Sequence, residues 1–188
     1  MYSKLSLLLV ALAGASAGKC PGSAAWIHAK CEFSVAFTGA SCAVVQAEVA
    51  ARIKGTDGWC DPHNKGTYTL DKSSPTEMDI HRKTGDGKYT DKQVLTFAAA
   101  ANGGCTMSAC SESQVTSVMD YSTNYCDLHD LYCGSADKCK FVVTDLSYSE
   151  NNISCSSGQH DMTKCQKTCG PTLRRVAPKP TFVDTVMA

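Results

Sequence analysis

Three absences limit the classes of protein to which this 188-residue chain can belong. It has no net charge, because 18 Lys and Arg residues balance 18 Asp and Glu residues. A general nucleic-acid binder needs surplus cations to displace the counterions of the phosphates, so that class is excluded. No apolar run reaches the roughly 20 residues that span a bilayer, so we expect no transmembrane segment. Metalloprotease H-E-x-x-H and phosphate-loop motifs are also missing.

The first 17 residues have the pattern of a secretory signal peptide. Lys4 precedes an apolar stretch that begins at Leu5, and the small residues Ala15, Ser16 and Ala17 follow it. A charged head, a short hydrophobic run and a small-x-small cleavage site are the three parts of such a peptide. We therefore expect residues 1–17 to be removed and the protein to be secreted into an extracellular, oxidising space.

Cysteine, by contrast, is abundant. All twelve cysteines follow the predicted signal peptide: Cys20, Cys31, Cys42, Cys60, Cys105, Cys110, Cys126, Cys133, Cys139, Cys155, Cys165 and Cys169. An even number in an exported chain predicts up to six disulfides. On a helix, Cys126 and Cys133 would be roughly 10 Å apart, too far to bond with each other. Zinc is the alternative, but Cys126 and His129 form only one loose ligand pair, so we expect neither metal nor cofactor.

Hydrophobic periodicity predicts an α+β fold. Residues 32–38 alternate between apolar and polar side chains, as in a strand with one buried face. Residues 42–53 show helical spacing, with apolar positions at Cys42, Val45, Val49 and Ile53 and polar positions at Gln46, Glu48 and Arg52. Further strands are expected at 68–71, 77–83, 89–97, 105–110 and 141–148, with a hairpin turn at 84–87. We expect a curved antiparallel sheet packed against one main amphipathic helix.

A short helical insert and a tail complete the predicted organisation. Ser111 and Gln114 fit a capping box that opens a helix through Met119, and a second helix is expected over residues 125–132. Residues 18–169 are interpreted as a single disulfide-stabilised domain. Residues 170–188 are interpreted as an extended or flexible tail, in which Arg174-Arg175 is a candidate processing site. Its β-prone residues 181–187 favour self-association, or contact with another extracellular protein, by strand addition.

The segment from Cys126 to Cys133 is the strongest candidate for chemistry. His129 and Asp130 lie between these two cysteines, and all four positions share one face of a helix. The segment resembles the active helix of secreted phospholipases A2, which implies that His129 is a general base and Asp130 a calcium ligand. It departs from that family in having one cysteine before the dyad instead of two adjacent ones, and three residues from the histidine to the next cysteine instead of two. The alternative is a disulfide-anchored helix with a surface His and Asp.

Other features are candidates for binding or modification. The loop at residues 59–64 is interpreted as a stapled turn, with sugar or metal binding as the alternative. Asp86 and Asp91 surround a glycine but lack the ligand spacing of an EF-hand. A stripe formed by Tyr121, Tyr125, Leu128 and Tyr132 predicts either core packing or stacking against a glycan. The sequon at residues 152–154 predicts glycosylation of Asn152.

Two longer segments are similar to uncharacterised secreted cysteine-rich proteins of unicellular eukaryotes: Arg82–Asp91 and Ser111–Cys126. The similarity covers most of residues 20–169 and implies no activity or catalytic residue. We expect a secreted, disulfide-stabilised, non-enzymatic structural or interaction protein of the cell surface or extracellular material. The alternatives are an extracellular lipid- or glycan-binding module and a calcium-dependent phospholipase A2-like hydrolase that uses His129 and Asp130.

Overall fold

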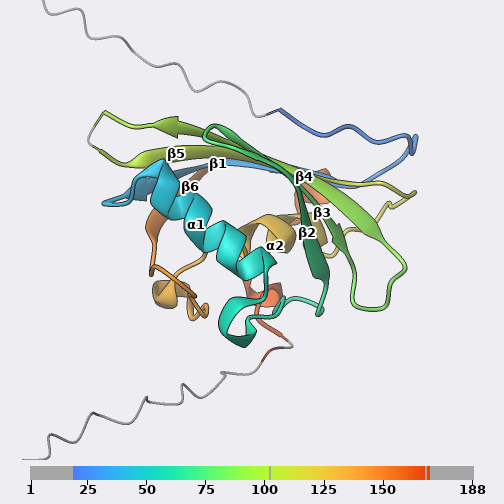
Figure 1. Ribbon diagram of the computed structural model, residues 1–188. Helices are drawn as coiled ribbons and strands as arrows, with labels where there is room; N and C mark the ends of the chain where they lie inside the picture. Colours follow the sequence, from blue (N-terminus) through green and yellow to red (C-terminus); the bar gives the residue numbers. More distant parts are fainter. Residues whose placement is uncertain (1–18, 102, 168, 170–188) are drawn as a thin grey trace, which may run out of the picture.

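The computed structural model describes residues 19–101, 103–167 and 169, so the predictions for residues 1–17 and 170–188 lie outside the described residues. Six strands form one antiparallel sheet in the order β2-β3-β4-β5-β1-β6 (Figure 1). They are β1 (Lys30–Thr38), β2 (Thr67–Ser74), β3 (Glu77–Lys83), β4 (Thr90–Ala99), β5 (Cys105–Ser113) and β6 (Ser147–Cys155). The predicted α+β class with an antiparallel sheet is therefore confirmed. No helix in the described ranges is long and apolar enough to cross a bilayer.

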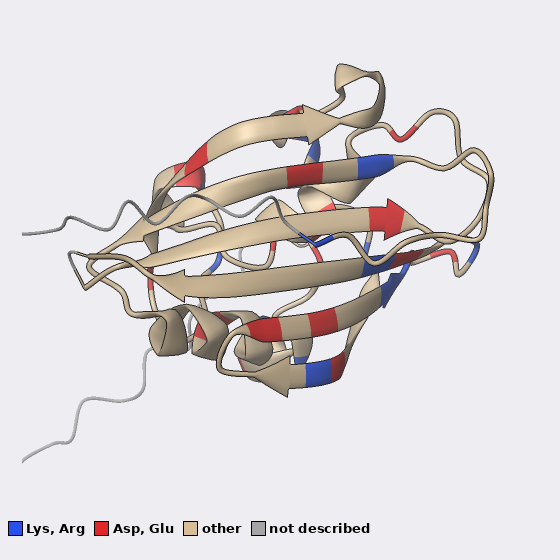
Figure 2. Ribbon diagram, turned by 90° about the horizontal axis from the view of Figure 1, so that it is seen from above, with Lys and Arg blue, Asp and Glu red and all other residues tan. Residues whose placement is uncertain are grey.

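Strand β1 lies inside the sheet, between β5 and β6, although it comes first in the chain. Strands β2 to β5 form a meander whose last strand returns to pair with β1. Phe33, Val35 and Phe37 of β1 are buried, as the alternating pattern predicts, because successive side chains point to opposite faces. Figure 2 shows the strands side by side from above, with acidic and basic residues interspersed along them.

Two α-helices, α1 (Cys42–Ile53) and α2 (Thr123–His129), lie on the same side of the sheet in the described part of the chain (Figure 1). Val45 and Val49 of α1 are fully buried and belong to the hydrophobic core. Glu48 and Arg52 are fully buried as well, so their expected place on a polar face is wrong. They tolerate burial because the Arg52 Nε donates to the Glu48 carboxylate at 2.7 Å.

The helix predicted over residues 111–119 does not form. Strand β5 continues to Ser113, which pairs with Asp91 of β4. The side chains of Ser111 and Ser113 are buried, where they form hydrogen bonds instead of capping a helix. The backbone pairing of the meander therefore overrides the local capping signal.

The predicted late strand also begins later, at Ser147 instead of 141. The backbone N–H groups of Val142, Val143 and Thr144 donate to the buried carboxylate of Glu48, at 2.8, 2.6 and 2.9 Å. These donors are therefore not available to a neighbouring strand. A buried acid on α1 determines the path of a segment almost one hundred residues away in the sequence.

All twelve cysteines form disulfides: Cys20–Cys110, Cys31–Cys155, Cys42–Cys105, Cys60–Cys169, Cys126–Cys165 and Cys133–Cys139. The predicted disulfide framework is confirmed. Cys126 and Cys133 bond to separate partners, as predicted. The helix expected over residues 125–132 is α2, which ends at His129, so of these two cysteines only Cys126 is helical. The bridges of Cys126 and Cys60 tie α2 and the loop after α1 to the last described residues, and they fix the loops below the sheet.

Candidate functional site

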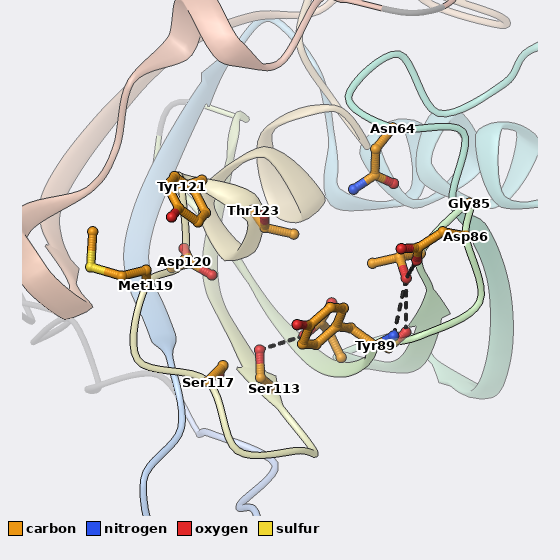
Figure 3. Close-up of a pocket in the computed structure, with 12 residues that line it drawn as sticks. Asn64, Gly85, Asp86, Tyr89, Ser113, Ser117, Met119, Asp120, Tyr121 and Thr123 are labelled. Carbon is orange, nitrogen blue, oxygen red and sulfur yellow. Dashed lines mark hydrogen bonds between the residues drawn. The ribbon is translucent and has the colours of Figure 1, made fainter.

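The main candidate site is a cavity of about 410 Å³ between the β3–β4 turn, the end of β5 and the start of α2. Its lining combines three carboxylates, several hydroxyls and two tyrosine rings: Asp86, Asp91, Asp120, Thr84, Ser113, Ser117, Thr123, Tyr89 and Tyr121, with Asn64, Gly85 and Met119. Figure 3 shows Asn64 and Asp86 on one side and Met119, Asp120 and Tyr121 on the opposite side, with Tyr89 between them. We call this space the acidic cavity.

The β3–β4 turn forms one wall of the acidic cavity. The N–H of Thr84 donates to the carbonyl of Tyr89 at 3.0 Å, and the Thr84 hydroxyl donates to the Asp86 carboxylate at 2.7 Å. A side chain at Gly85 would collide with the loop before β2, because its Cβ would lie 2.2 Å from the carbonyl oxygen of Asn64. The predicted hairpin is confirmed, and it brings Asp86 and Tyr89 to the cavity.

The opposite wall is the segment between β5 and α2. Tyr121 and Ser122 have φ angles of 52° and 68°, a left-handed conformation that is uncommon for residues other than glycine. The carboxylate of Asp120 accepts hydrogen bonds from the backbone N–H of Asn124 at 3.2 and 3.3 Å and from its side-chain amide at 2.7 Å. These bonds hold Asp120 at the start of α2 while the adjacent Tyr121 ring stays exposed. Backbone strain of this kind persists where the surrounding structure enforces it.

Next to the acidic cavity, the buried guanidinium of Arg82 contacts the cavity residues Asn64 and Asp91 and is shared by three carboxylates. It contacts Asp61, lies 3.0 Å from the Oδ1 of Asp127 and lies 3.7 Å from the Oδ2 of Asp91. Both carboxylate oxygens of Asp127 and the Oδ2 of Asp91 have no hydrogen bond of normal geometry within the described residues. Asp120 adds a fourth acid close enough to interact with Asp91 and Asp127. One cation is thus shared by three carboxylates, and a fourth acid interacts with two of them.

The surplus of acid changes the proton affinity of these carboxyls. Burial raises the pKa of Asp127 well above its usual value, and nearby Asp91 and Asp61 raise it further against the effect of Arg82. Burial, with a smaller contribution from Asp91, also raises the pKa of Asp120. For Arg82, burial alone would lower the pKa, but Asp127 and Asp61 raise it above its usual value. A positive ligand in the cavity would relieve this imbalance.

The mouth of the acidic cavity is aromatic and apolar. The side chains of Tyr89, Met119 and Tyr121 are 45%, 54% and 62% exposed. Ile27, which is also exposed, lies next to this rim because the N–H of Ser117 donates to its carbonyl at 3.1 Å. Aromatic faces above carboxylates attract organic cations through the ring quadrupole and through charge.

His129 and Asp130, the candidates for hydrolysis, face different surroundings. Both side chains are fully buried, so the alternative of a surface His and Asp is wrong. The Nδ1 of His129 lies 2.7 Å from the Oε1 of Glu150, and His129 lines neither of the two cavities. Asp130 lines the second cavity and accepts a hydrogen bond from the Gln166 amide at 3.1 Å. Burial, with a contribution from Asp61, raises the pKa of Asp130 well above its usual value.

Glu150 on β6 holds His129 in place. Its carboxylate also accepts hydrogen bonds from the hydroxyls of Tyr125 at 2.7 Å and Tyr132 at 2.5 Å. Burial alone would raise the pKa of Glu150, but the hydrogen bonds from His129 and the two tyrosines lower it below its usual value. Tyr125 and Tyr132 are buried core residues, so of the predicted tyrosine stripe only Tyr121 is exposed at a cavity.

A second cavity, of about 580 Å³, lies beyond the C-terminal end of α2. Arg52, Asp130, Cys133, Cys139 and Gln166 contribute to its lining. Arg52 donates to the carbonyls of Asp130 at 2.9 Å and Cys133 at 2.7 Å, so its guanidinium is engaged in the interior. The Cys133–Cys139 disulfide forms part of the cavity wall.

The loop at residues 59–64 is a stapled turn. Asp61 accepts hydrogen bonds from the backbone N–H groups of His63 at 2.9 Å and Gly66 at 2.6 Å, and Cys60 is bonded to Cys169. The His63 ring instead contacts the Lys164 carbonyl, with the Nδ1 at 2.8 Å, so the carboxylate and the imidazole do not converge on one ligand position.

Asn152 lies in strand β6 instead of the expected turn, and its φ of 56° interrupts the regular strand. It is exposed, and its amide lies 3.3 Å from the hydroxyl of Ser34. Glycosylation of this residue stays a prediction.

The acidic cavity is not visible in the sequence as a unit. The sequence suggests Asp86 and Asp91 only as calcium candidates, and Asp120 stands out in no motif. One signal was available: Arg82 follows Ile80 at a spacing of two, which places a cation on the buried face of β3. A buried arginine requires acidic partners, so several of the aspartates had to converge on it.

No protein-family model matches this chain, and no curated protein or solved structure matches it significantly. The similarities to phospholipases A2 and to secreted cysteine-rich proteins therefore stay predictions. What the protein binds or does has to be inferred from the geometry of its own residues.

Proposed function

We propose that this chain is an extracellular, disulfide-stabilised binding protein without catalytic activity, and that its ligand is an organic cation. Six disulfides suit an oxidising extracellular space. One observation carries the choice of ligand. The carboxylates of Asp61, Asp91 and Asp127 share the single guanidinium of Arg82, and Asp120 interacts with two of them. Two of these four acids, Asp91 and Asp120, line an accessible cavity.

The lining of the acidic cavity favours a quaternary ammonium group with an apolar substituent. A volume of about 410 Å³ accommodates a small ligand of this kind. The Tyr89 and Tyr121 rings offer π faces, each worth about 0.5–2 kcal/mol to a cation depending on its desolvation. Met119 extends the rim as an apolar contact for the substituent. Choline has this chemistry, either free or as the headgroup of a lipid.

The other candidate functions receive less support from the same residues. A neutral glycan matches the hydroxyls of Ser113, Ser117 and Thr123, but it leaves the surplus of carboxylates uncompensated. A hydrolase that uses His129 as a general base needs solvent or substrate at its ring, and this side chain is 0% exposed. A purely structural protein does not account for buried carboxyls that lack hydrogen-bond partners.

The test compares choline with 3,3-dimethylbutan-1-ol, which has the same shape but no charge. We titrate each compound into the disulfide-intact secreted protein by isothermal titration calorimetry. We expect choline to bind at least about tenfold more tightly than the neutral compound, which corresponds to about 1.4 kcal/mol. Equal affinity, no choline binding at millimolar concentration, or binding of neutral sugars alone would each contradict the proposal.

Matched variants place the ligand in the acidic cavity. Asp120→Asn should weaken choline binding about tenfold, because it removes one charge and keeps an acceptor for the Asn124 N–H. The control is Asp57→Asn, which changes an exposed acid outside the cavity at a φ of 54° that asparagine also tolerates. Tyr121→Phe should retain binding and Tyr121→Asn should lose it, because only the former keeps an aromatic face.

A further inference from the structure

A second group of side chains has an arrangement that the cation-binding function does not use. A ring nitrogen of His129 and the sulfur atoms of Cys133 and Cys139 all lie within 4.8 Å of one another. All three residues are buried. The Nδ1 of His129 lies 2.7 Å from Glu150, whereas its Nε2 has no hydrogen-bond partner among the described residues. A buried imidazole nitrogen without a partner requires an explanation.

We propose that His129, Cys133 and Cys139 form a latent site for a divalent transition metal such as Zn²⁺, which is completed when the Cys133–Cys139 disulfide is reduced. A dithiol supplies two electrons and two protons to the S–S bond, so that two thiols form and the dithiol becomes a cyclic disulfide. The metal then displaces the two thiol protons. It forms two metal–sulfur bonds and one bond to the Nε2 of His129.

The donor set and its spacing fit such an ion. Two thiolates and an imidazole are typical zinc ligands, and around a tetrahedral zinc ion the ligand atoms lie about 3.3–3.8 Å apart. The three atoms lie within 4.8 Å of one another, so small side-chain movements bring them to these distances. In the oxidised protein the two sulfurs are bonded to each other, and they have to separate before both can hold the metal.

The surroundings of His129 prepare it as a ligand. Because the Glu150 carboxylate is 2.7 Å from the Nδ1, it favours a proton there and leaves the lone pair of the Nε2 free for a metal. The hydroxyls of Tyr125 and Tyr132 donate to the same carboxylate and fix its position. The ring is thus oriented before any metal arrives, as in carboxylate–histidine–metal arrangements generally.

The second cavity gives a reductant and an ion a route to this disulfide, because Cys133 and Cys139 are in its lining. Arg52, which also lines this cavity, lies 3.7 Å from the sulfur of Cys133. Asp130 also lines this cavity, and its Oδ2 has no hydrogen-bond partner in the described residues. A water molecule from this cavity can complete the coordination.

The experiment uses Co²⁺ as a spectroscopic substitute for Zn²⁺. The full secreted chain is reduced with dithiothreitol, separated from it without oxygen, and titrated with Co²⁺. We expect one equivalent to bind, with thiolate-to-cobalt absorption in the near ultraviolet and visible bands of tetrahedral cobalt, and no such bands for the oxidised protein. The double variant Cys133→Ser/Cys139→Ser should lose both features.

Two further variants separate this site from the other cysteines and from a folding defect. Cys60→Ser/Cys169→Ser removes another disulfide that lines the same cavity, and it should bind Co²⁺ like the wild type. Glu150→Gln keeps every thiol but should lower the affinity for Co²⁺ about 10–100-fold. It tests the proposal even if the first double variant does not fold. The proposal is wrong if the reduced wild type takes up no Co²⁺, or if it loses its native near-ultraviolet circular dichroism. It is also wrong if binding survives the loss of Cys133 and Cys139, or is unchanged in Glu150→Gln.

Discussion

The described part of the chain contains two arginines, both buried, and their surroundings differ. Arg52 forms one salt bridge within the described residues, with Glu48 at 2.7 Å, and donates to two backbone carbonyls. Glu48 accepts three backbone N–H groups besides. No side-chain nitrogen or oxygen of either residue is left without a partner among the described residues. We call this the balanced centre, because its one ion pair is closed in hydrogen bonding; Asp130 also interacts with Arg52, but without a salt bridge.

Arg82 is surrounded by more acid than it can neutralise. It is shared by Asp61, Asp91 and Asp127, and several of these polar atoms lack a hydrogen bond of normal geometry in the described structure. The balanced centre joins α1 to the segment before β6, so its role is to hold the fold. The unbalanced centre reaches the acidic cavity through Asp91, and there a ligand can supply the missing positive charge. Charge balance therefore separates a structural from a binding centre.

Removal of either guanidinium has the largest expected effect. Arg52→Met and Arg82→Met should each lower the free energy of unfolding at neutral pH by about 3–5 kcal/mol, because each leaves buried carboxylates unpaired. Urea unfolding at about pH 7 and about pH 5 distinguishes them. At about pH 5 the free energy of unfolding of Arg82→Met should recover, because its aspartates readily take up protons. That of Arg52→Met should not recover, because Glu48 keeps three N–H donors. If the free energy of unfolding recovers equally in both variants, the two arginine centres do not differ as proposed.

Replacing one acid by its amide in each centre should give effects of opposite sign. Glu48→Gln should lower the free energy of unfolding by about 1.5–3 kcal/mol, because it weakens charge-assisted hydrogen bonds. Asp127→Asn should raise it by roughly 1 kcal/mol at neutral pH, because it removes a surplus buried charge. Urea unfolding of both variants at the same pH is the measurement. If both substitutions destabilise the protein alike, the two centres are equivalent.

The pH dependence of the free energy of unfolding tests the same contrast with a smaller expected effect. Asp120, Asp127 and Asp130 have raised pKa values, so the folded state binds more protons than the unfolded chain above about pH 4, the usual aspartate pKa. The free energy of unfolding should therefore rise as the pH falls through this window. Glu48 and Glu150 have lowered pKa values, so their stabilisation is lost only as the pH falls further, through their folded pKa values.

These shifts predict greatest stability in mildly acidic solution. Unfolding by urea at a series of pH values measures the profile, and Asp127→Asn should flatten its rise. A stability that declines steadily from neutral to mildly acidic pH would show that the buried aspartates are not proton acceptors.

The sequence predicts the features that depend on neighbouring residues, and it does not predict those that depend on contacts between residues far apart in the chain. Local periodicity is enough for β1, α1 and the turn at residues 84–87. It misplaces Glu48 and Arg52, because polarity in a sequence does not reveal a partner across the fold. The count of cysteines predicts six disulfides but not their pairing, which joins residues up to 124 positions apart.

The acidic cavity depends on the same long-range contacts. Asp61, Asp91 and Asp127 are far apart in the sequence and meet only at Arg82. Arg82, which faces inward on β3, predicts that acidic partners are needed, but it does not predict which residues they are or whether they outnumber the positive charge. The surplus itself, which is the basis of the proposed function, is visible only in three dimensions.

The smallest expected effect comes from glycine at two strained positions. Tyr121 and Lys138 have φ angles of 52° and 65°, which glycine adopts without steric cost. Tyr121→Gly and Lys138→Gly should each raise the free energy of unfolding by about 0.5–1 kcal/mol in thermal unfolding. Only Tyr121→Gly should also lose choline binding. Loss of binding in both variants, or in neither, would remove Tyr121 from the proposed site.

Proton exchange during ligand binding shows whether surplus buried carboxyls attract the cation. Choline is titrated into the wild-type protein in buffers that differ in their heat of ionisation, at mildly acidic pH, so that the heats report the protons exchanged. We expect a measurable release of protons into solution as the ammonium group replaces them, and a smaller release for Asp120→Asn. Binding of choline with no proton release, or with proton uptake, would mean that the acids around Arg82 do not form a site for positive charge.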